Sequence, residues 1–260
     1  MNDYYQLCNK ILSIGNRESN ARTGQDTRVL FGESMTFCME DYTLPVVTRK
    51  RVDLHNILTE LNWFLSGSTN IKPLQDQDVN IWNEWADENG DLGPVYGKQW
   101  TDFGGVDQIS RLIRGLIDNP SCRRHIVSAW NVAELSEMAL PPCHLMFQCH
   151  VRDGMWLDMQ MYQRSADMFL GVPYNITSYA LLLAGIADHV GLYTGKLKIV
   201  IGNAHIYENH VDAMTKMLAN KDYKRPLFEA RLMKSSEGWC IEALIEPYKS
   251  GPFIPAPVAV

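Results

Sequence analysis

An α+β fold in one domain is predicted by three features of the sequence. Blocks of strand-like sequence are mixed with amphipathic helices along the chain, which is typical of α+β proteins. The chain has 260 residues, of which 46% are hydrophobic and 21% charged, a globular composition that can bury a sizeable core. No repeat, low-complexity tract or Ser/Gly linker divides it, so we expect a single domain over residues 1–260.

The first expected elements are a short helix, a strand and a longer helix. Residues 4–14 are expected to form the short helix, and residues 29–37 a strand with a bulge at Gly32. The longer helix covers residues 54–65 and ends at Gly67. Its buried face is predicted by five residues with helical spacing: Leu54, Ile57, Leu58, Leu61 and Leu65.

A long stretch without regular periodicity follows at residues 73–105. It is rich in Gly, Asp and Asn and holds three of the seven tryptophans, so we expect a functional loop. Later helices are expected at residues 108–117, 175–190 and 207–218. Later strands are expected at residues 124–130, 144–151, 156–163 and 198–201.

Charge and cysteine content argue against several classes of protein. Lysine and arginine number 24 against 30 acidic residues, a net charge of −6, so we expect no DNA binding and no attachment to an anionic membrane. No apolar run reaches the ~18 residues of a membrane span, and we expect no secretory signal at the N-terminus. The six cysteines show no C-x-x-C spacing, so we expect reduced thiols in the cytoplasm.

Cys143 is the first candidate for chemistry. It follows two prolines, precedes His144 and opens an apolar strand. A nearby cation lowers the pKa of a thiol and increases its thiolate fraction, which is what a cysteine nucleophile needs. The alternative interpretation of the local sequence is a buried structural thiol.

Arginines and other polar residues at predicted strand ends are a second group of candidates. Residues 164–167 (RSAD) end one strand, and Arg123 and Arg124 open another, so they either hold a phosphomonoester or form surface salt bridges. His205 and Tyr207 lie between a predicted strand and a predicted helix, and they either bind a ligand or pack in the core.

Glu60 lies on the predicted 54–65 helix, close to its end. It is either a buried acid or base with a raised pKa or an exposed helical residue. The sequence shows neither zinc-ligand spacing nor a glycine-rich phosphate fingerprint, so we expect no metal.

Over nearly its whole length the chain resembles the thymidylate synthases, the folate-dependent enzymes that methylate dUMP. Long matching segments in one order are highly specific, and they favour the functional interpretation of each candidate. These segments are residues 20–24 (NARTG), 60–65 (ELNWFL), 81–100 (IWNEWADENGDLGPVYGKQW), 122–131 (CRRHIVSAWN), 141–144 (PPCH), 162–175 (YQRSADMFLGVPYN), 205–207 (HIY) and 256–260 (APVAV).

The resemblance implies the thymidylate synthase-like fold, a mixed twisted β-sheet flanked by helices. It also implies a homodimer in which the sheets of two subunits pack back to back. The active sites would be shared between the subunits, because Arg123 and Arg124 of one subunit would reach the phosphate bound by the other.

By this resemblance Cys143 is the thiolate that adds to carbon 6 of dUMP and makes carbon 5 nucleophilic. Arg164 would lower the pKa of this thiol and would hold the phosphate together with Arg22 and Ser165. His144 would support the polar network around the nucleophile.

Other residues would recognise the nucleotide and move protons. Asn175 would bind the uracil edge, and its amide favours dUMP because the dCMP-using relatives carry Asp there. His205 and Tyr207 would bind the deoxyribose hydroxyl. Glu60, with ordered water, would move protons at the ring carbonyl, and Tyr96 would help to remove the carbon 5 proton.

The implied co-substrate is 5,10-methylenetetrahydrofolate, which would stack over the nucleotide. Trp82 and Trp85 would form part of its wall, and Asp167 would bind the pterin beside the nucleotide. Lys50 would meet the glutamate tail. Val260 would fold over the site and exclude water.

Five positions depart from the family's pattern on the folate side or in the core strand beneath it: Asn62, Asn83, Thr101, Cys149 and His150. They leave open a deoxyuridylate hydroxymethylase, which traps the same methylene intermediate with water and releases tetrahydrofolate. Asn62 could hold such a water, whereas Trp82 and residues 256–260 favour its exclusion. A catalytically silent nucleotide- or RNA-binding relative is a third alternative, and the complete set of catalytic residues argues against it.

Overall fold

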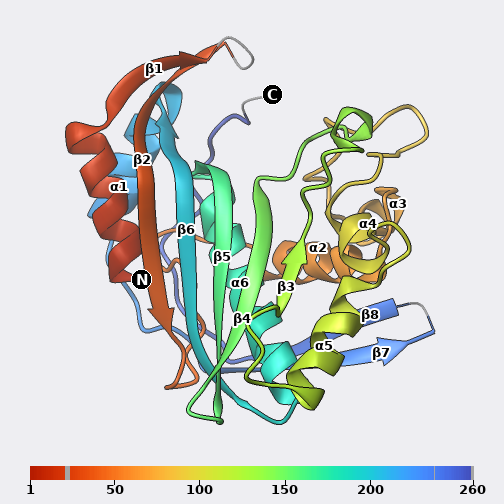
Figure 1. The fold of residues 1–260 in the computed structure, drawn as a ribbon. Coiled ribbons are helices and arrows are strands. Elements are labelled where there is room, and N and C mark those ends of the chain that lie inside the picture. Colours follow the sequence, from red (N-terminus) through yellow and green to blue (C-terminus); the bar gives the residue numbers. More distant parts are fainter. Residues whose placement is uncertain (21–23, 237, 259–260) are drawn as a thin grey trace.

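The computed structural model describes residues 1–20, 24–236 and 238–258, and its centre is a six-stranded sheet (Figure 1). β5 and β6 run parallel, whereas each other neighbouring pair in this sheet is antiparallel. This arrangement confirms the predicted α+β class and mixed sheet. The strands in spatial order are β1 (Asn16–Asn20), β2 (Gln25–Cys38), β6 (Tyr193–Tyr207), β5 (Trp156–Asp167), β4 (His144–Arg152) and β3 (Ile126–Ser128).

One face of this sheet is covered by α6 (Gly171–His189), which Figure 1 shows behind the strands. Residues 176–187 of α6 are all buried, because their apolar side chains surround the helix axis and leave no polar face for water. A two-stranded hairpin of β7 (Phe228–Ser235) and β8 (Gly238–Ile245) also packs on α6. A Cβ at Gly185 would lie 3.2 Å from a side-chain carbon of Ile241, so glycine permits this close approach.

α2 (Leu54–Ser66) packs against both α6 and the hairpin, close to the predicted boundaries. The Asp53 carboxylate caps its first turn, and Gly67 ends it in the left-handed conformation at φ 78°. The remaining helices are α1 (Asn2–Ile14), α3 (Lys72–Gln75), α4 (Tyr96–Thr101), α5 (Gln108–Asp118), α7 (Val211–Ala219) and the short 3₁₀ turns η1 (Leu135–Glu137) and η2 (Glu208–His210).

β6 is much longer than the strand expected at residues 198–201. It pairs with β2 on one side and with β5 on the other, and this pairing extends it as far as Tyr207. His205 therefore lies within the strand, and Tyr207 is its last residue, directly before the 3₁₀ turn η2 (Glu208–His210). The helix expected from residue 207 begins as α7 at Val211.

The bulge expected at Gly32 does not occur, because the pairing of β2 with β6 shows no register shift there. Phe31 pairs with Asn203 and Glu33 pairs with Ile201, so the register of β2 against β6 is the same on both sides of Gly32. Gly32 has φ 82°, a backbone conformation that an L side chain rarely adopts. Gly32 therefore allows a backbone conformation with positive φ in β2 without changing the register of β2 against β6.

β1, the β7–β8 hairpin and α4 were not predicted from the sequence. β1 is short and polar, so it carries no apolar alternation. The β7–β8 hairpin does carry that signal, since Phe228, Ala230 and Leu232 are buried and alternate with exposed residues. The stretch 73–105 includes the short helix α4, whose residues pack on α2. Among the described residues no helix is long and apolar enough to cross a membrane.

Candidate active site

A cavity of about 640 Å³ opens at the end of the sheet where β5 and β6 finish and β4 begins. Five of the predicted site residues line it together: Cys143, Arg164, Ser165, His205 and Tyr207. Its other lining residues are Glu18, Ser19, Thr27, Trp130, Leu140, Pro141 and Asn203.

Strand pairing explains why residues so far apart in sequence meet here. β5 and β6 are parallel, so their carboxyl ends share one edge, and Ser165 pairs with Asn203 in that register. β4 is antiparallel to β5, so the residue that precedes β4 lies beside the end of β5. The Arg164 backbone N–H donates to the carbonyl oxygen of Cys143 at 2.8 Å, which joins the two segments directly.

The Arg164 guanidinium is held by the chain segment that carries Cys143. Its Nε donates to the Pro142 carbonyl at 2.8 Å, and a terminal nitrogen donates to the Pro141 carbonyl at 2.6 Å. The guanidinium carbon lies 5.6 Å from the centre of the Trp130 ring. The proline pair thus fixes a permanent positive charge next to the cysteine, and this charge lines the cavity.

A buried aromatic network lies behind Cys143. The Cys143 backbone N–H donates to the Tyr96 hydroxyl oxygen at 2.7 Å, and the Tyr96 ring stacks on His144 with centroids 4.2 Å apart. His144 Nδ1 lies 2.9 Å from the Tyr179 hydroxyl. Burial lowers the pKa of His144 to about 3 and raises the pKa of Tyr96 well above its usual value, so both side chains are neutral at pH 7.

Glu60 faces the same aromatic cluster from α2. Its Oε1 accepts a hydrogen bond from Trp82 Nε1 at 2.8 Å, and the Trp82 ring lies 6.1 Å from that of Tyr96. Burial raises the pKa of Glu60 to about 7, although the Trp82 hydrogen bond opposes this change. A carboxyl group that titrates near neutral pH suits proton transfer. Trp85 packs edge-on against Trp82 with centroids 5.8 Å apart.

Asn175, in the second turn of α6, is oriented by Gln163, a residue that was not among the predicted site residues. Gln163 Nε2 donates to Asn175 Oδ1 at 3.0 Å and to the Ser165 carbonyl at 3.1 Å. Gln163 Oε1 is buried and has no hydrogen-bond partner. Gln163 lies directly before Arg164, within the matching segment 162–175, and this position is the signal that could have identified it.

Asp167 and Lys50 do not line this cavity, and each is engaged by the backbone of the turn after β5. Asp167 Oδ1 accepts from the backbone N–H groups of Phe169 at 2.8 Å and Leu170 at 3.1 Å, and so stabilises the turn between β5 and α6. Lys50 is 5% exposed and donates to the Phe169 carbonyl at 2.6 Å. Burial lowers the pKa of Lys50 to about 8.

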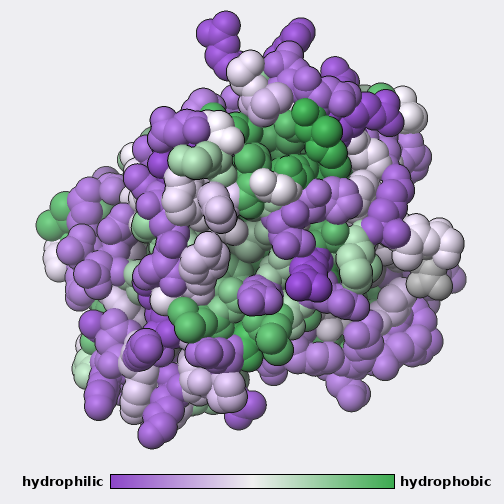
Figure 2. Space-filling model, turned by 90° about the horizontal axis from the view of Figure 1, so that it is seen from below, coloured by the Kyte–Doolittle hydropathy of each residue, from purple (hydrophilic) through white to green (hydrophobic). Residues whose placement is uncertain are grey.

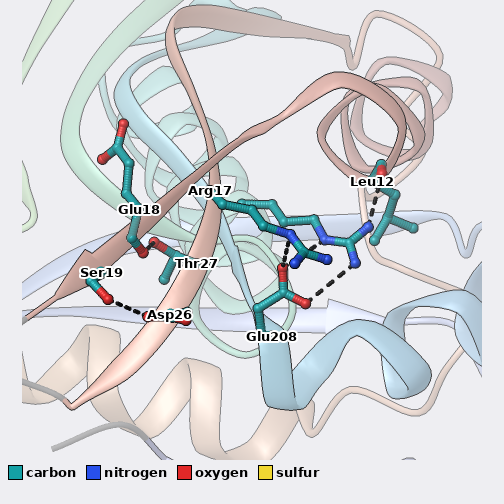
Figure 3. A network of polar contacts seen from close by, with 8 residues as sticks. Leu12, Arg17, Glu18, Ser19, Asp26, Thr27 and Glu208 are labelled. Atoms are coloured by element: carbon teal, nitrogen blue, oxygen red, sulfur yellow. Dashed lines mark hydrogen bonds and ion pairs between the residues drawn. The ribbon is translucent and has the colours of Figure 1, made fainter.

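The β1–β2 hairpin forms a wall of the cavity that sequence reasoning missed. Figure 3 shows Glu18, Ser19 and Thr27 on this hairpin, where the Thr27 hydroxyl donates to the Glu18 carbonyl at 3.2 Å. Ser19 donates to Asp26 across the same strands. These residues are polar and show no apolar alternation, so no local pattern predicts that they line a cavity. Of the predicted site residues, Arg22 and Val260 lie outside the described residues.

Arg123 and Arg124 do not line the cavity of their own subunit. Both are exposed in the segment before β3. Arg124 forms a hydrogen bond with Cys122, which lowers the pKa of that thiol.

A second cavity, of about 490 Å³, lies at the opposite end of the sheet, around the start of β6 and β7. Figure 2 views the molecule from that end and shows apolar patches among hydrophilic ones. None of the predicted site residues lines it. Within residues 1–20, 24–236 and 238–258 no group of three or more His, Cys, Asp or Glu is arranged to hold a metal ion.

The chain is thus an α+β protein whose cavity is built around a cysteine and a fixed arginine at one end of a mixed sheet. Its sequence matches the family model described as thymidylate synthase over residues 2–260, so the chain belongs to the thymidylate synthase family. Membership of this family implies one-carbon transfer to dUMP with methylenetetrahydrofolate as co-substrate.

Proposed function

We propose that this protein is a thymidylate synthase that methylates carbon 5 of dUMP and releases dTMP and dihydrofolate. The Cys143 thiolate adds to carbon 6, so the ring becomes an enolate that is nucleophilic at carbon 5. Carbon 5 attacks the methylene group carried by the folate. Loss of the carbon 5 proton and hydride transfer from the folate complete the methyl group, and Cys143 is expelled.

The residues around Cys143 suit binding of the nucleotide. Arg164, Ser165 and Arg22 take the phosphate, with Arg123 and Arg124 supplied by a partner subunit. This assignment is supported by the lining of the cavity, where Arg164 and Ser165 lie beside Cys143. A positive charge held next to the thiol also favours the thiolate.

Recognition of the base and sugar is assigned to the other polar groups at this end of the sheet. Asn175 binds the uracil edge, and its amide is held in place by Gln163. His205 and Tyr207 bind the deoxyribose hydroxyl, and both side chains line the cavity.

Proton transfer is assigned to the aromatic network and Glu60. A pKa of about 7 lets Glu60 both give and accept a proton near the ring carbonyl. Tyr96 assists removal of the carbon 5 proton through water, and neutral His144 holds the Tyr96 ring by stacking. The folate stacks over the nucleotide along Trp82 and Trp85.

The remaining contacts with the folate are assigned to Asp167, Lys50 and Val260. Asp167 contacts the pterin, Lys50 meets the glutamate tail, and Val260 closes over the site to exclude water. Lys50 is buried against Phe169, so its contact with the tail requires the ammonium to leave the Phe169 carbonyl.

Methylation is favoured over hydroxymethylation by the positions of the five departures from the family's pattern. None of them lines the cavity. Asn62 binds the Ile241 backbone with both ends of its amide, at 3.0 Å and 2.7 Å, so its side chain is held by β8 and does not line the cavity. Thr101 donates to the Gly97 carbonyl at 3.0 Å within α4. The engagement of Asn62 is the observation that carries the choice of product.

Product analysis tests this proposal. The protein is incubated with dUMP and methylenetetrahydrofolate, the nucleotide is identified by mass and the folate by absorbance. We expect dTMP together with dihydrofolate in equal amounts. Hydroxymethyl-dUMP together with tetrahydrofolate would instead establish the hydroxymethylase, and the absence of both products would refute one-carbon transfer.

A further inference from the structure

His210 lies between the C-terminal segment and the turn after β5, and the proposed mechanism does not use it. Its imidazole is 0% exposed at the end of η2. Nε2 lies 2.7 Å from the Pro257 carbonyl oxygen, and the Phe169 and Tyr207 rings lie 5.7 Å and 5.3 Å from the imidazole. Three separate parts of the chain therefore converge on this one side chain.

The contact with Pro257 fixes the tautomer of His210. A carbonyl oxygen can only accept a hydrogen bond, so Nε2 carries the proton and donates. Nδ1 is buried without a hydrogen-bond partner, and it lies 3.9 Å from Asp167 Oδ1. The ring thus faces the C-terminal segment with its donor and the Asp167 turn with its other nitrogen.

The histidine is held on a rigid part of the fold. η2 follows β6 directly, and Glu208 of η2 accepts two hydrogen bonds from Arg28 of β2, at 2.9 Å and 3.3 Å. Figure 3 shows Glu208 facing β2 from this turn, with Arg17 approaching the same carboxylate. The sheet therefore fixes the position of His210.

The C-terminal segment after β8 forms neither helix nor strand over residues 246–258 and depends on individual contacts. The Gly251 N–H donates to the Thr48 carbonyl at 2.8 Å, and the Arg51 N–H donates to the Pro252 carbonyl at 3.1 Å. Ile254 is then buried at 6% exposure. The bond from His210 to Pro257 is the next attachment, only one residue before the end of the described segment at position 258.

We propose that His210 is a positioning residue that fastens the C-terminal segment, at Pro257, to the Asp167 turn on the folate side of the cavity. Figure 1 shows the dark blue C-terminal segment running toward the end of the sheet that carries the β1–β2 hairpin, which is a wall of that cavity. The folate in this statement rests on the proposed function, whereas the attachment of the segment does not.

Limited proteolysis tests the attachment without any substrate. Phe253 is 71% exposed and precedes the buried Ile254, so chymotrypsin can release residues 254–260, which mass spectrometry detects. In His210→Phe the ring remains but the donor is lost, and we expect release roughly three- to tenfold faster, the effect of one hydrogen bond. In His210→Gln the side-chain N–H replaces Nε2, and we expect release near the unaltered rate. Equal rates in all three proteins would overturn the attachment.

Kinetics test the positioning. We expect His210→Phe to raise KM for methylenetetrahydrofolate several-fold while the Kd for dUMP is unchanged, and His210→Gln to restore most of the loss. A chain that ends at Ala256 keeps His210 but lacks both its acceptor and Val260, so its KM should rise at least as much, and His210→Phe should add nothing to it. A further loss in that shortened chain would show that His210 acts through another contact and would overturn the proposal.

The attachment and the proposed function can fail independently of each other. If His210→Phe releases residues 254–260 faster but the unaltered protein transfers no one-carbon unit, the attachment is supported and the proposed function is refuted. Confirmed dTMP formation with an unchanged folate KM in His210→Phe would retain the function and overturn the positioning role. Circular dichroism of each variant establishes that it is folded before these comparisons are made.

Discussion

At the scale of single residues, the side chains of the site are held in place by neighbours with no chemical role of their own. The carbonyls of Pro141 and Pro142 bind the Arg164 guanidinium, and Gln163 holds the Asn175 amide. Such contacts orient a group before the substrate arrives, which limits the reorganisation needed in the reaction. The cavity therefore presents a fixed charge beside Cys143, and the Asn175 amide is held by a residue next to Arg164 in sequence.

Replacing Cys143 by Ser should abolish turnover, because the weakly nucleophilic hydroxyl does not form the adduct. Binding of dUMP, measured by calorimetry, should stay within about tenfold, since the thiolate acts mainly in the chemical step. Cys38→Ser is the matched control, because Cys38 is exposed outside the cavity and its variant should retain full activity. A large loss of dUMP binding in Cys143→Ser would mean that the residue has been misassigned.

Replacing Glu60 by Gln should lower kcat by roughly 10²–10⁴, the usual contribution of a general acid or base. The same variant should also change the pH dependence of stability. The folded-state pKa of about 7 exceeds the ordinary 4.5, so the unfolded chain ionises first and stability falls as pH rises between these values.

This loss should be absent from Glu60→Gln, whose free energy of unfolding relative to the unaltered protein should increase by about 1–3 kcal/mol between pH 4.5 and pH 8. Urea unfolding at these two pH values measures the difference. Equal differences at both pH values would mean that Glu60 ionises as freely in the folded protein as in the unfolded chain.

At the scale of elements, α2 uses two faces for two purposes. Glu60 faces Trp82 and the aromatic cluster, whereas Asn62, two residues later, faces the hairpin and binds the backbone of Ile241. Residues two apart on a helix point in different directions, so a polar residue at position 62 need not affect the chemistry at position 60.

Asn62→Leu should therefore lower the free energy of unfolding by roughly 1–3 kcal/mol, because the Ile241 N–H and carbonyl lose their partner. The product ratio should not change, which nucleotide analysis by mass measures. Asn83→Asp is the control, since Asn83 is exposed and a surface change is usually within about 0.5 kcal/mol. A shift of product from one nucleotide to the other in Asn62→Leu would assign Asn62 to the reaction after all.

At the scale of the whole molecule, no helix of the part of the chain that the structure describes covers the second face of the six-stranded sheet. In β5, Met159, Met161 and Gln163 are buried, whereas Gln160 is exposed and Tyr162 half-exposed on the other face. Figure 1 shows this face in front of the strands, with α6 behind them. An uncovered sheet face of this kind supports the proposal that two subunits pack back to back.

Mixing two inactive variants tests the shared sites. Cys143→Ser supplies intact arginines, and the double variant Arg123→Ala, Arg124→Ala supplies an intact cysteine. In a mixed dimer one of the two sites has both, so random exchange should restore about 25% of the unaltered activity. Mixing Cys143→Ser with Cys143→Ala should restore none. Persistent inactivity of the first mixture, with dimers present by sedimentation, would contradict sharing of the arginines.

The sequence by itself determined the class of fold and the longer helices. Helical periodicity identified α2 and α5 almost to the residue, because their apolar spacing is a local property of the chain. Matching segments also made Cys143 and Arg164 the candidates for chemistry, and the structure places both in the lining of one cavity.

Only the tertiary structure decided which of these residues meet and how they are held. The ends of β5 and β6 share one edge through long-range pairing that no local pattern records, and so β6 reached Tyr207 against the expected helix. The structure also gave Asn62 a partner in β8, which no local pattern of the sequence predicts. A side chain's type is written in the sequence, whereas its hydrogen-bond partners and its burial, which set its pKa and its function, arise when distant segments pack together.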